Sequence, residues 1–278
     1  MRNSKRPSLA ATGLLARLCT LCILLSSPTL QAAELYVTAE YGISQGLGSV
    51  DVNHQFDQAR EDSDDASPVL GAGLGLALPL HELLPLRMSL PRIDLPIWPG
   101  KALTFGGHED WRFPDWDVRF ELAYLDGREY DFRADGADPW FTNGKARSLM
   151  ATARLDLPVQ APLTALFGRI PILDPLTVYG AAGVGAAHTE AVTLSNQDKA
   201  TKESFEFAWE VDAGLGYAIS DALHLSIGWR YIDLGTTQGT IKNAGTNRGR
   251  ADVDMRAHEF TTSIRYSFWR VPFFEGTQ

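Results

Sequence analysis

The sequence predicts an all-β protein, an eight-stranded antiparallel up-and-down transmembrane β-barrel with long outer loops. Apolar side chains occupy every second position of 205–219 and 223–231 and, apart from Thr262, of 259–268, which is the period of a β-strand. Such segments are about ten residues long, close to the length of a tilted transmembrane strand. The amino terminus indicates export, and strongly polar connections alternate along the chain with proline-bearing or tight ones.

Alternation alone does not say which face of a strand points inward. In a soluble barrel the apolar face forms the core, whereas in a membrane barrel it faces lipid and the polar face lines the lumen. Aromatic residues gather towards the strand ends, as they do at the two surfaces of a bilayer. Strand length, aromatic placement and export favour the membrane barrel. A secreted soluble eight-stranded barrel is the alternative.

The first 32 residues have the order of a secretory signal peptide. Four basic residues precede or interrupt a short apolar run at 18–25, and small residues follow that run. This order predicts cleavage after Ala32 or one residue later. Cys19 and Cys22 both fall inside the leader, and the leucine before each of them argues against a lipoprotein site.

Removal of the leader leaves an acidic chain without cysteine. The leader carries four basic residues and no acidic ones, so the formal net charge changes from -9 to -13. Such acidity argues against nucleic acid as a partner. The predicted organisation is a signal peptide at 1–32, one barrel domain at 33–268 and a short tail at 269–278. The predicted location is the outer membrane of a Gram-negative bacterium.

The predicted strands are joined by connections of two kinds. The strands are 35–44, 70–78, 117–124, 148–156, 176–187, 205–219, 223–231 and 259–268. Polar connections follow the first, third, fifth and seventh strands and are predicted to be solvated outer loops, at 46–67, 127–145, 188–203 and 234–256. The connections predicted to lie in the periplasm are 79–114, 158–175 and the turn Ser220–Asp221. An even number of strands is typical of bacterial single-chain barrels.

The segment 79–114 is unusual for a periplasmic connection. It carries six prolines among leucine, isoleucine and tryptophan residues. Proline at this density excludes a long helix and argues against a central strand. The prediction is an irregular apolar segment against the periplasmic membrane interface. An extra hairpin, which would make ten strands, is the alternative.

Charged residues gather at the positions predicted to face the lumen. They are Glu40, Asp117, Arg119, Glu121, Arg154, Asp156, Glu206, Glu210, Asp212, Arg230, Glu259 and Arg265. The interior of an eight-stranded barrel is just wide enough for side chains to fill, and an unpaired buried charge is strongly unfavourable. The prediction is a lumen charge network of arginine–carboxylate pairs centred on Arg230. A narrow ion path through the same residues is the alternative.

Catalysis, cofactors and metals find little support in the sequence. An enzyme that modifies outer-membrane lipids needs a nucleophile beside a base. The nearest candidates are His258 with Ser263 and His224 with Ser226, and neither pair lies in a recognisable motif. On a strand only the second pair shares a face. The six histidines lack metal-ligand spacing. The prediction is a protein without enzymatic activity, cofactor or metal.

Segments rich in glycine and aromatic residues recur in the second half of the chain. They are VYGAAGVG at 178–185, GLGY at 214–217, GWRYIDLG at 228–235 and the close RYSF at 265–268. These segments resemble the opacity-protein and OmpA-type outer-membrane barrels, a porin-like family of small barrels. The resemblance implies a role in envelope integrity or surface contact. The chain departs from the family pattern in its two long periplasmic connections and in the residues that follow Phe268. If Tyr266 and Phe268 are the assembly signal, that signal lies inside the chain and not at its end.

The predicted function is therefore a structural surface protein with a side-chain-filled lumen and outer loops that contact a ligand. The alternatives are a small outer-membrane channel and a lipid-modifying enzyme. The predicted partners are outer-membrane lipid, the barrel assembly machinery and a surface ligand of the outer loops.

Overall fold

The computed structural model describes residues 33–54, 57–62, 66–80, 93–98, 101–105, 116–134, 139–159, 171–195 and 198–270. The predicted signal peptide and most of the predicted tail, 271–278, lie outside the described residues. No helix within the described ranges has the length and hydropathy needed to cross a membrane.

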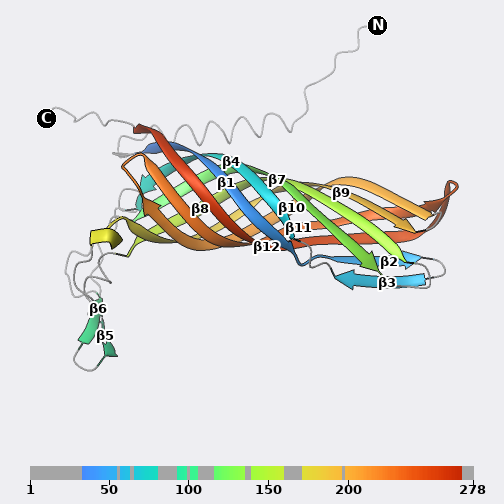
Figure 1. Ribbon diagram of the computed structural model, residues 1–278, viewed down its shortest axis with the longest axis horizontal. Coiled ribbons are helices and arrows are strands. Elements are labelled where there is room, and N and C mark those ends of the chain that lie inside the picture. The colour runs from blue at the N-terminus through green and yellow to red at the C-terminus, as the bar shows by residue number, and fades with distance from the viewer. Residues whose placement is uncertain are drawn as a thin grey trace, which may run out of the picture.

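Eight strands close into an antiparallel barrel (Figure 1). They are β1 (Glu34–Gly46), β4 (Ala66–Pro79), β7 (Asp117–Ala134), β8 (Trp140–Pro158), β9 (Leu176–Ser195), β10 (Asp198–Ala218), β11 (Leu223–Asn243) and β12 (Thr246–Arg270). Each strand pairs with the next one around the ring. β1 also pairs with β12 along its whole length, so the first and last strands close the barrel. The predicted eight-stranded up-and-down barrel is confirmed.

The other described elements are short. β2 (Ser49–His54) pairs with β12 and with β3 (Asp57–Asp62), while β5 (Ile93–Trp98) and β6 (Lys101–Phe105) form a separate hairpin. A 3₁₀ turn, η1, covers Pro171–Leu173. The segment 79–114 was predicted to be irregular, and that is wrong for the part that forms β5 and β6. The hairpin lies outside the barrel sheet, so the ten-stranded alternative is also wrong. A proline such as Pro96 is tolerated there because a two-stranded hairpin consists of edges alone.

The polar segments predicted as loops are largely strand. β9 to β12 are 20 to 25 residues long, about twice the length that crosses a bilayer. We call the outer extension the residues 49–54, 57–62, 128–134, 140–147, 188–195, 198–204, 234–243 and 246–257. Figure 1 shows these strands continuing past the barrel wall at the end opposite the β5–β6 hairpin.

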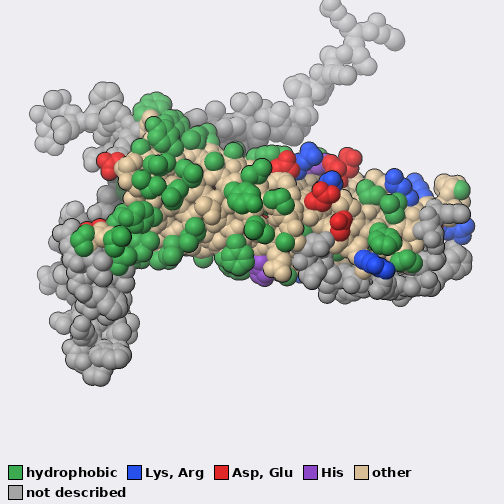
Figure 2. All heavy atoms as spheres, viewed as in Figure 1, with side chains coloured by type: hydrophobic (Ala, Val, Ile, Leu, Met, Phe, Trp, Pro, Cys, Tyr) green, Lys and Arg blue, Asp and Glu red, His purple; other side chains and the backbone are tan. Residues whose placement is uncertain are grey.

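The polarity of the two faces inverts along the strands. On β12 the inward positions Val253 and Met255 are apolar and buried, whereas the inward Glu259 and Arg265 are charged. The outward side chains of β12 show the opposite change. They are charged at 252, 254 and 256 and mostly apolar from Phe260 onward. Charged outward side chains are typical of a surface in water, and apolar outward side chains are typical of a strand surface in lipid. The inversion therefore indicates that the outer extension stands in water and the apolar part of the barrel wall faces lipid. Figure 2 shows the same division on one face of the molecule.

The inversion explains why the predicted strands were too short. The alternation of inward and outward side chains continues into the outer extension, but charged outward residues there resemble a solvated loop. The extension has its own apolar core, which includes Val52, Tyr130, Phe132, Trp140 and Met255. This core lies inside the barrel directly beyond the charged lumen.

A charged lumen as the candidate functional site

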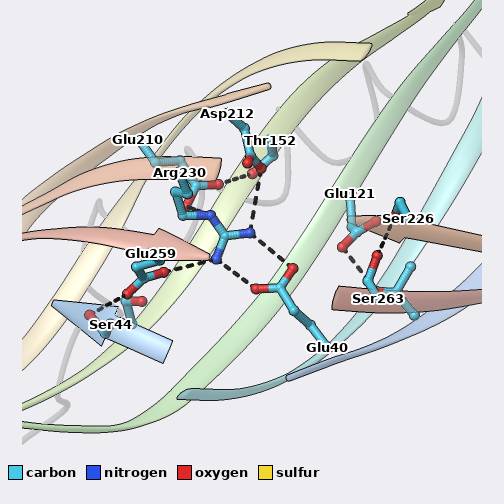
Figure 3. A network of polar contacts seen from close by, with 12 residues as sticks. Glu40, Ser44, Glu121, Thr152, Glu210, Asp212, Ser226, Arg230, Glu259 and Ser263 are labelled. Carbon is cyan, nitrogen blue, oxygen red and sulfur yellow. Dashed lines mark hydrogen bonds and ion pairs between the residues drawn. The ribbon is translucent and has the colours of Figure 1, made fainter. Parts of the chain in front are cut away.

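Arg230 on β11 is the centre of a buried network (Figure 3). Its Nη1 donates to Glu40 at 2.7 Å and to Glu259 at 3.2 Å, and its Nη2 donates to Glu40 at 3.0 Å and to Asp212 at 3.4 Å. Its Nε lies 3.3 Å from a carboxylate oxygen of Glu210. The side chains of Arg230, Glu210 and Glu259 are all at least 95 % buried. One guanidinium thus faces four carboxylates from three other strands.

The strand register creates this arrangement. Asp212 on β10, Arg230 on β11 and Glu259 on β12 are direct cross-strand partners and lie on one rung of the barrel. Glu40 reaches the same guanidinium from β1, on the far side of β12. Opposite charges on one rung are mutually favourable, and the narrow lumen holds them within hydrogen-bond distance.

A second guanidinium joins the network through Glu259. Arg128 on β7 donates to Glu259 at 2.6 Å and 3.1 Å, and both side chains are completely buried. Ser148 accepts a hydrogen bond from Arg128 at 3.1 Å, and Ser44 donates one to Glu259 at 3.0 Å. Two arginines therefore share Glu259, which partly offsets the excess of carboxylates around Arg230.

The sequence did not indicate Arg128 as a lumen residue, because it lies in the segment 127–145 that was predicted to be an outer loop. Outward residues on β7 have even numbers up to Tyr124, so Arg128 would point outward if the strand were regular. The pairing of β7 with β8 shifts between Leu125 and Arg128, and Gly127 in the shift has φ +101°. This bulge turns Arg128 inward. The Asp126–Gly127 pair was the sequence signal for it.

The lumen nearer the Ser220–Asp221 turn holds a separate ion pair. Arg119 donates from Nε and Nη2 to the two oxygens of Asp156 at 2.5 Å and 2.7 Å. The guanidinium of Arg119 also lies 5.9 Å from the centre of the Tyr36 ring, and that of Arg265 lies 5.4 Å from it. Tyr36 is fully buried. Two cations therefore lie close to one ring, and Asp156 forms an ion pair with the first of them.

Of three further predicted residues, two contact other groups in the lumen and one does not join the network. Arg154 lies 3.3 Å from Asp212 and stacks over the Tyr179 ring at 4.2 Å. Glu121 accepts a hydrogen bond from Thr38 at 2.9 Å. Glu206 is half-buried and forms no ion pair with the described residues, so the structure does not bring it into the network.

The predicted assembly residues lie on the opposite surface. Tyr266 and Phe268 are 52 % and 50 % exposed on the lipid-facing wall. β12 continues two residues into the predicted tail, where Trp269 pairs with Leu35 and Arg270 pairs with Glu34.

The histidine–serine pairs considered for catalysis do not assemble. Ser226 and Ser263 hydrogen-bond to each other at 2.6 Å across β11 and β12. His258 points outward and stacks against Trp229 at 5.3 Å. Neither His258 nor His224 hydrogen-bonds to a serine within the described ranges. Those ranges also contain no group of three or more metal-ligating side chains.

The lumen is closely packed around the network. A small cavity of about 10 Å³ lies against Tyr36, Glu121, Arg154, Glu210 and Arg230. A site for a single water needs about 10–15 Å³. This cavity thus has room for about one water.

Close packing predicts a specific loss of stability at Gly75. Gly75 pairs with Tyr36 across β4 and β1, and a Cβ on Gly75 would overlap the buried Tyr36 ring. Gly75→Val should lower the free energy of unfolding by about 1–3 kcal/mol. Urea unfolding in lipid vesicles measures the change. Gly180→Val is the matched control, because Gly180 is exposed and a Cβ there meets nothing within 4 Å. Equal losses for both variants would contradict the prediction.

A second polar region lies outside the wall where the outer extension begins. It is a hollow of about 210 Å³ lined by residues that include Asp126, Glu129, Lys145 and Arg147. Lys145 lies 3.0 Å from Glu129, and Arg147 lies 3.4 Å from Asp126. Hydrogen bonds from Lys145 and then Asn143 hold the pKa of the Glu129 carboxyl below its usual value. These ion pairs are half exposed and contribute little to stability.

The chain is similar in part to uncharacterized proteins of the genus Brucella. Uncharacterized proteins of Brucella abortus, Brucella suis and Brucella melitensis are 34 % identical over 123 residues, which cover 36 % of this chain and 43 % of theirs. The chain thus matches less than half the length of these relatives.

Solved structures with a similar fold include three outer-membrane proteins. Neisserial surface protein A has 16 % identity and a TM-score of 0.34, with 85 % of this chain and 99 % of that chain covered. OprG of Pseudomonas aeruginosa has 12 % identity and a TM-score of 0.40, with 87 % and 99 % covered. The outer membrane protease OmpT of Escherichia coli has 10 % identity and a TM-score of 0.44, with 84 % and 97 % covered.

The family model described as an outer membrane protein beta-barrel domain matches residues 18–268, most of the chain. With the closed ring of strands and the lipid-facing apolar wall, this match places the protein in the outer membrane of a Gram-negative bacterium. The chain belongs to the outer membrane protein beta-barrel domain family.

Proposed function

We propose that this chain is a structural surface protein whose barrel is closed by its own side chains and whose outer extension is the surface for contact. The observation that carries the proposal is the presence of two barriers in series. The Arg230 network fills the lumen, and the apolar core that includes Tyr130, Phe132 and Met255 fills the barrel beyond it. A hydrated ion would have to pass both.

The closed lumen gives a conductance prediction. The purified protein in a planar bilayer should show no steady openings. Arg230→Ala should also show none, because the apolar core of the outer extension still blocks the path and ions enter an apolar region only at high cost. Altered gel mobility on boiling serves as the control that the variant is folded. Steady openings that change with Arg230→Ala would contradict the proposal and favour the channel.

The lipid-modifying enzyme is the second alternative, and we propose that the protein has no such activity. The support is that the two candidate histidine–serine pairs do not assemble within the described residues. Mass spectrometry of lipid A after overexpression tests this, since an enzyme would change the lipid masses and a structural protein would leave them unchanged.

The proposal includes the organisation expected from the sequence. The leader 1–32 would be removed on export, the barrel would occupy 33–268, and the barrel assembly machinery would read Tyr266 and Phe268 on the lipid-facing wall. The outer extension would carry the contact surface for a ligand, and its mixed ion pairs near Glu129 and Arg147 lie at the bilayer edge of that surface. The intact mass of the mature protein tests the cleavage site.

A further inference from the structure

A groove crosses the lipid-facing wall over β10, β11, β12 and β1. Its volume is about 530 Å³, and outward side chains from two neighbouring rungs of the barrel line it. The upper rung, nearer the outer extension, is Ala213, Trp229, Phe260 and Ile43. The lower rung is Leu215, Ile227, Thr262 and Tyr41. The groove thus joins four strands, and no charged side chain lines it.

Differences in side-chain size create the groove. Thr262 is short and lies between Ile227 and Tyr41 on its rung, and Ala213 is short beside Trp229. The lining reaches the backbone at Gly42, Gly214 and Gly228, below the level of the large side chains. The neighbours of Thr262 are large, because Phe260 precedes it on β12 and Ile227 pairs with it from β11, and these two side chains are 63 % and 58 % exposed. The hollow is therefore built into the wall by the cross-strand register.

The groove faces the hydrocarbon of the membrane, because it lies in the apolar wall of an outer-membrane barrel. An unfilled hollow has no partner atoms on its open side and loses dispersion contacts. A flexible acyl chain matches its apolar lining, which extends over four strands. A protein partner would need an interface of about 1,000 Å² or more, of which the groove itself is a small part.

Aromatic rings mark the depth of the groove in the bilayer. Trp209 stacks with Tyr231 at 5.3 Å, Tyr231 with His258 at 5.5 Å, and His258 with Trp229 at 5.3 Å. Such aromatic girdles lie at the level of the lipid head groups. The groove begins on the bilayer side of this ladder, at the edge nearer the outer extension. It therefore faces the leaflet on that side, which in the predicted orientation is the outer leaflet.

We propose that this groove binds one acyl chain of lipid A, the acylated anchor of the lipopolysaccharide that forms the outer leaflet of Gram-negative outer membranes. The aromatic faces of Trp229 and Phe260 contact the chain, and Thr262 forms part of the floor. This site is separate from the lumen, so it does not depend on whether the lumen is closed.

Native mass spectrometry of the full-length mature protein tests the site. The protein is refolded in vesicles of phosphatidylethanolamine with hexa-acylated lipid A and released in mild detergent. Thr262→Phe fills the groove and should lower the fraction of protein that retains lipid A about tenfold. Ala213→Leu fills the other rung and should lower it in the same direction. Gel mobility on boiling establishes that each variant is folded.

Ala151→Phe is the matched control. Ala151 is an exposed outward residue on β8, which lies four strands from β12 in the closed ring. It should retain lipid A as the wild type does. Equal retention by all four proteins would overturn the proposal, and so would wild-type protein that retains phosphatidylethanolamine instead of lipid A. A lipid-free dimer that Thr262→Phe dissociates would assign the groove to a second copy and also overturn it.

Discussion

Glu259→Ala is expected to lower the free energy of unfolding by about 3–5 kcal/mol. Glu259 is completely buried and accepts hydrogen bonds from Arg128, Arg230 and Ser44. Arg230 keeps three other carboxylates after the substitution. Arg128 has no other ion pair among the described residues, and its side chain is completely buried. An uncompensated buried guanidinium accounts for the size of the effect.

Urea unfolding of the protein in phospholipid vesicles measures this change. Glu129→Ala is the matched control, because its pair with Lys145 is half exposed and its loss should cost no more than about 1 kcal/mol. The double variant Arg128→Leu with Glu259→Leu removes both charges and should recover most of the lost stability. Equal losses of stability for Glu259→Ala and Glu129→Ala would contradict the prediction, because the buried Arg128–Glu259 pair would then contribute no more than an exposed pair.

The membrane-spanning part of the barrel could be predicted from the sequence because one rule governs it. Alternating side chains face lipid or lumen, and the outward Phe260 and the inward Glu259 lie where that rule places them. The same rule with the polarity reversed governs the outer extension, where Val253 and Met255 point inward. The sequence does not show where water replaces lipid, so charged outward residues such as Arg256 led to the prediction of a loop instead of a strand.

Contacts between distant strands could be predicted only in part. Arg230 between Asp212 and Glu259 follows from neighbouring strands, so the sequence order of the hairpins is sufficient. The approach of Glu40 to Arg230 requires closure of the ring between β1 and β12. The rungs of the lipid-facing groove likewise depend on a register that joins residues about 220 positions apart along the chain, such as Tyr41 and Thr262.

Arg128 shows how one local irregularity limits such a prediction. A strand of period two places every later residue on a face set by the earlier ones, and a bulge of one residue reverses that assignment. The bulge at Gly127 therefore decides whether Arg128 meets Glu259 or points into lipid and water. Glycine tolerates its φ of +101°, which a side chain rarely adopts.

Gly127→Val is accordingly expected to destabilise the protein by about 2–4 kcal/mol. A β-branched residue is strained at this φ, and its Cβ would lie 2.7 Å from the carbonyl oxygen of Pro68. Gly245→Val is the matched control, because Gly245 has φ +86° but a Cβ there meets nothing within 4 Å. It should carry backbone strain without the overlap, and its effect in urea unfolding should be the smaller one.

A double-variant cycle shows whether Gly127 acts through Arg128. If Gly127→Val straightens the strand and turns Arg128 outward, Glu259 has already lost that partner before it is replaced. Gly127→Val combined with Glu259→Ala should then cost less than the sum of the two single variants, by more than about 0.5 kcal/mol. Additive losses would mean that Arg128 reaches Glu259 without the bulge. The register shift at Gly127 would then be a packing feature of the β7–β8 hairpin alone.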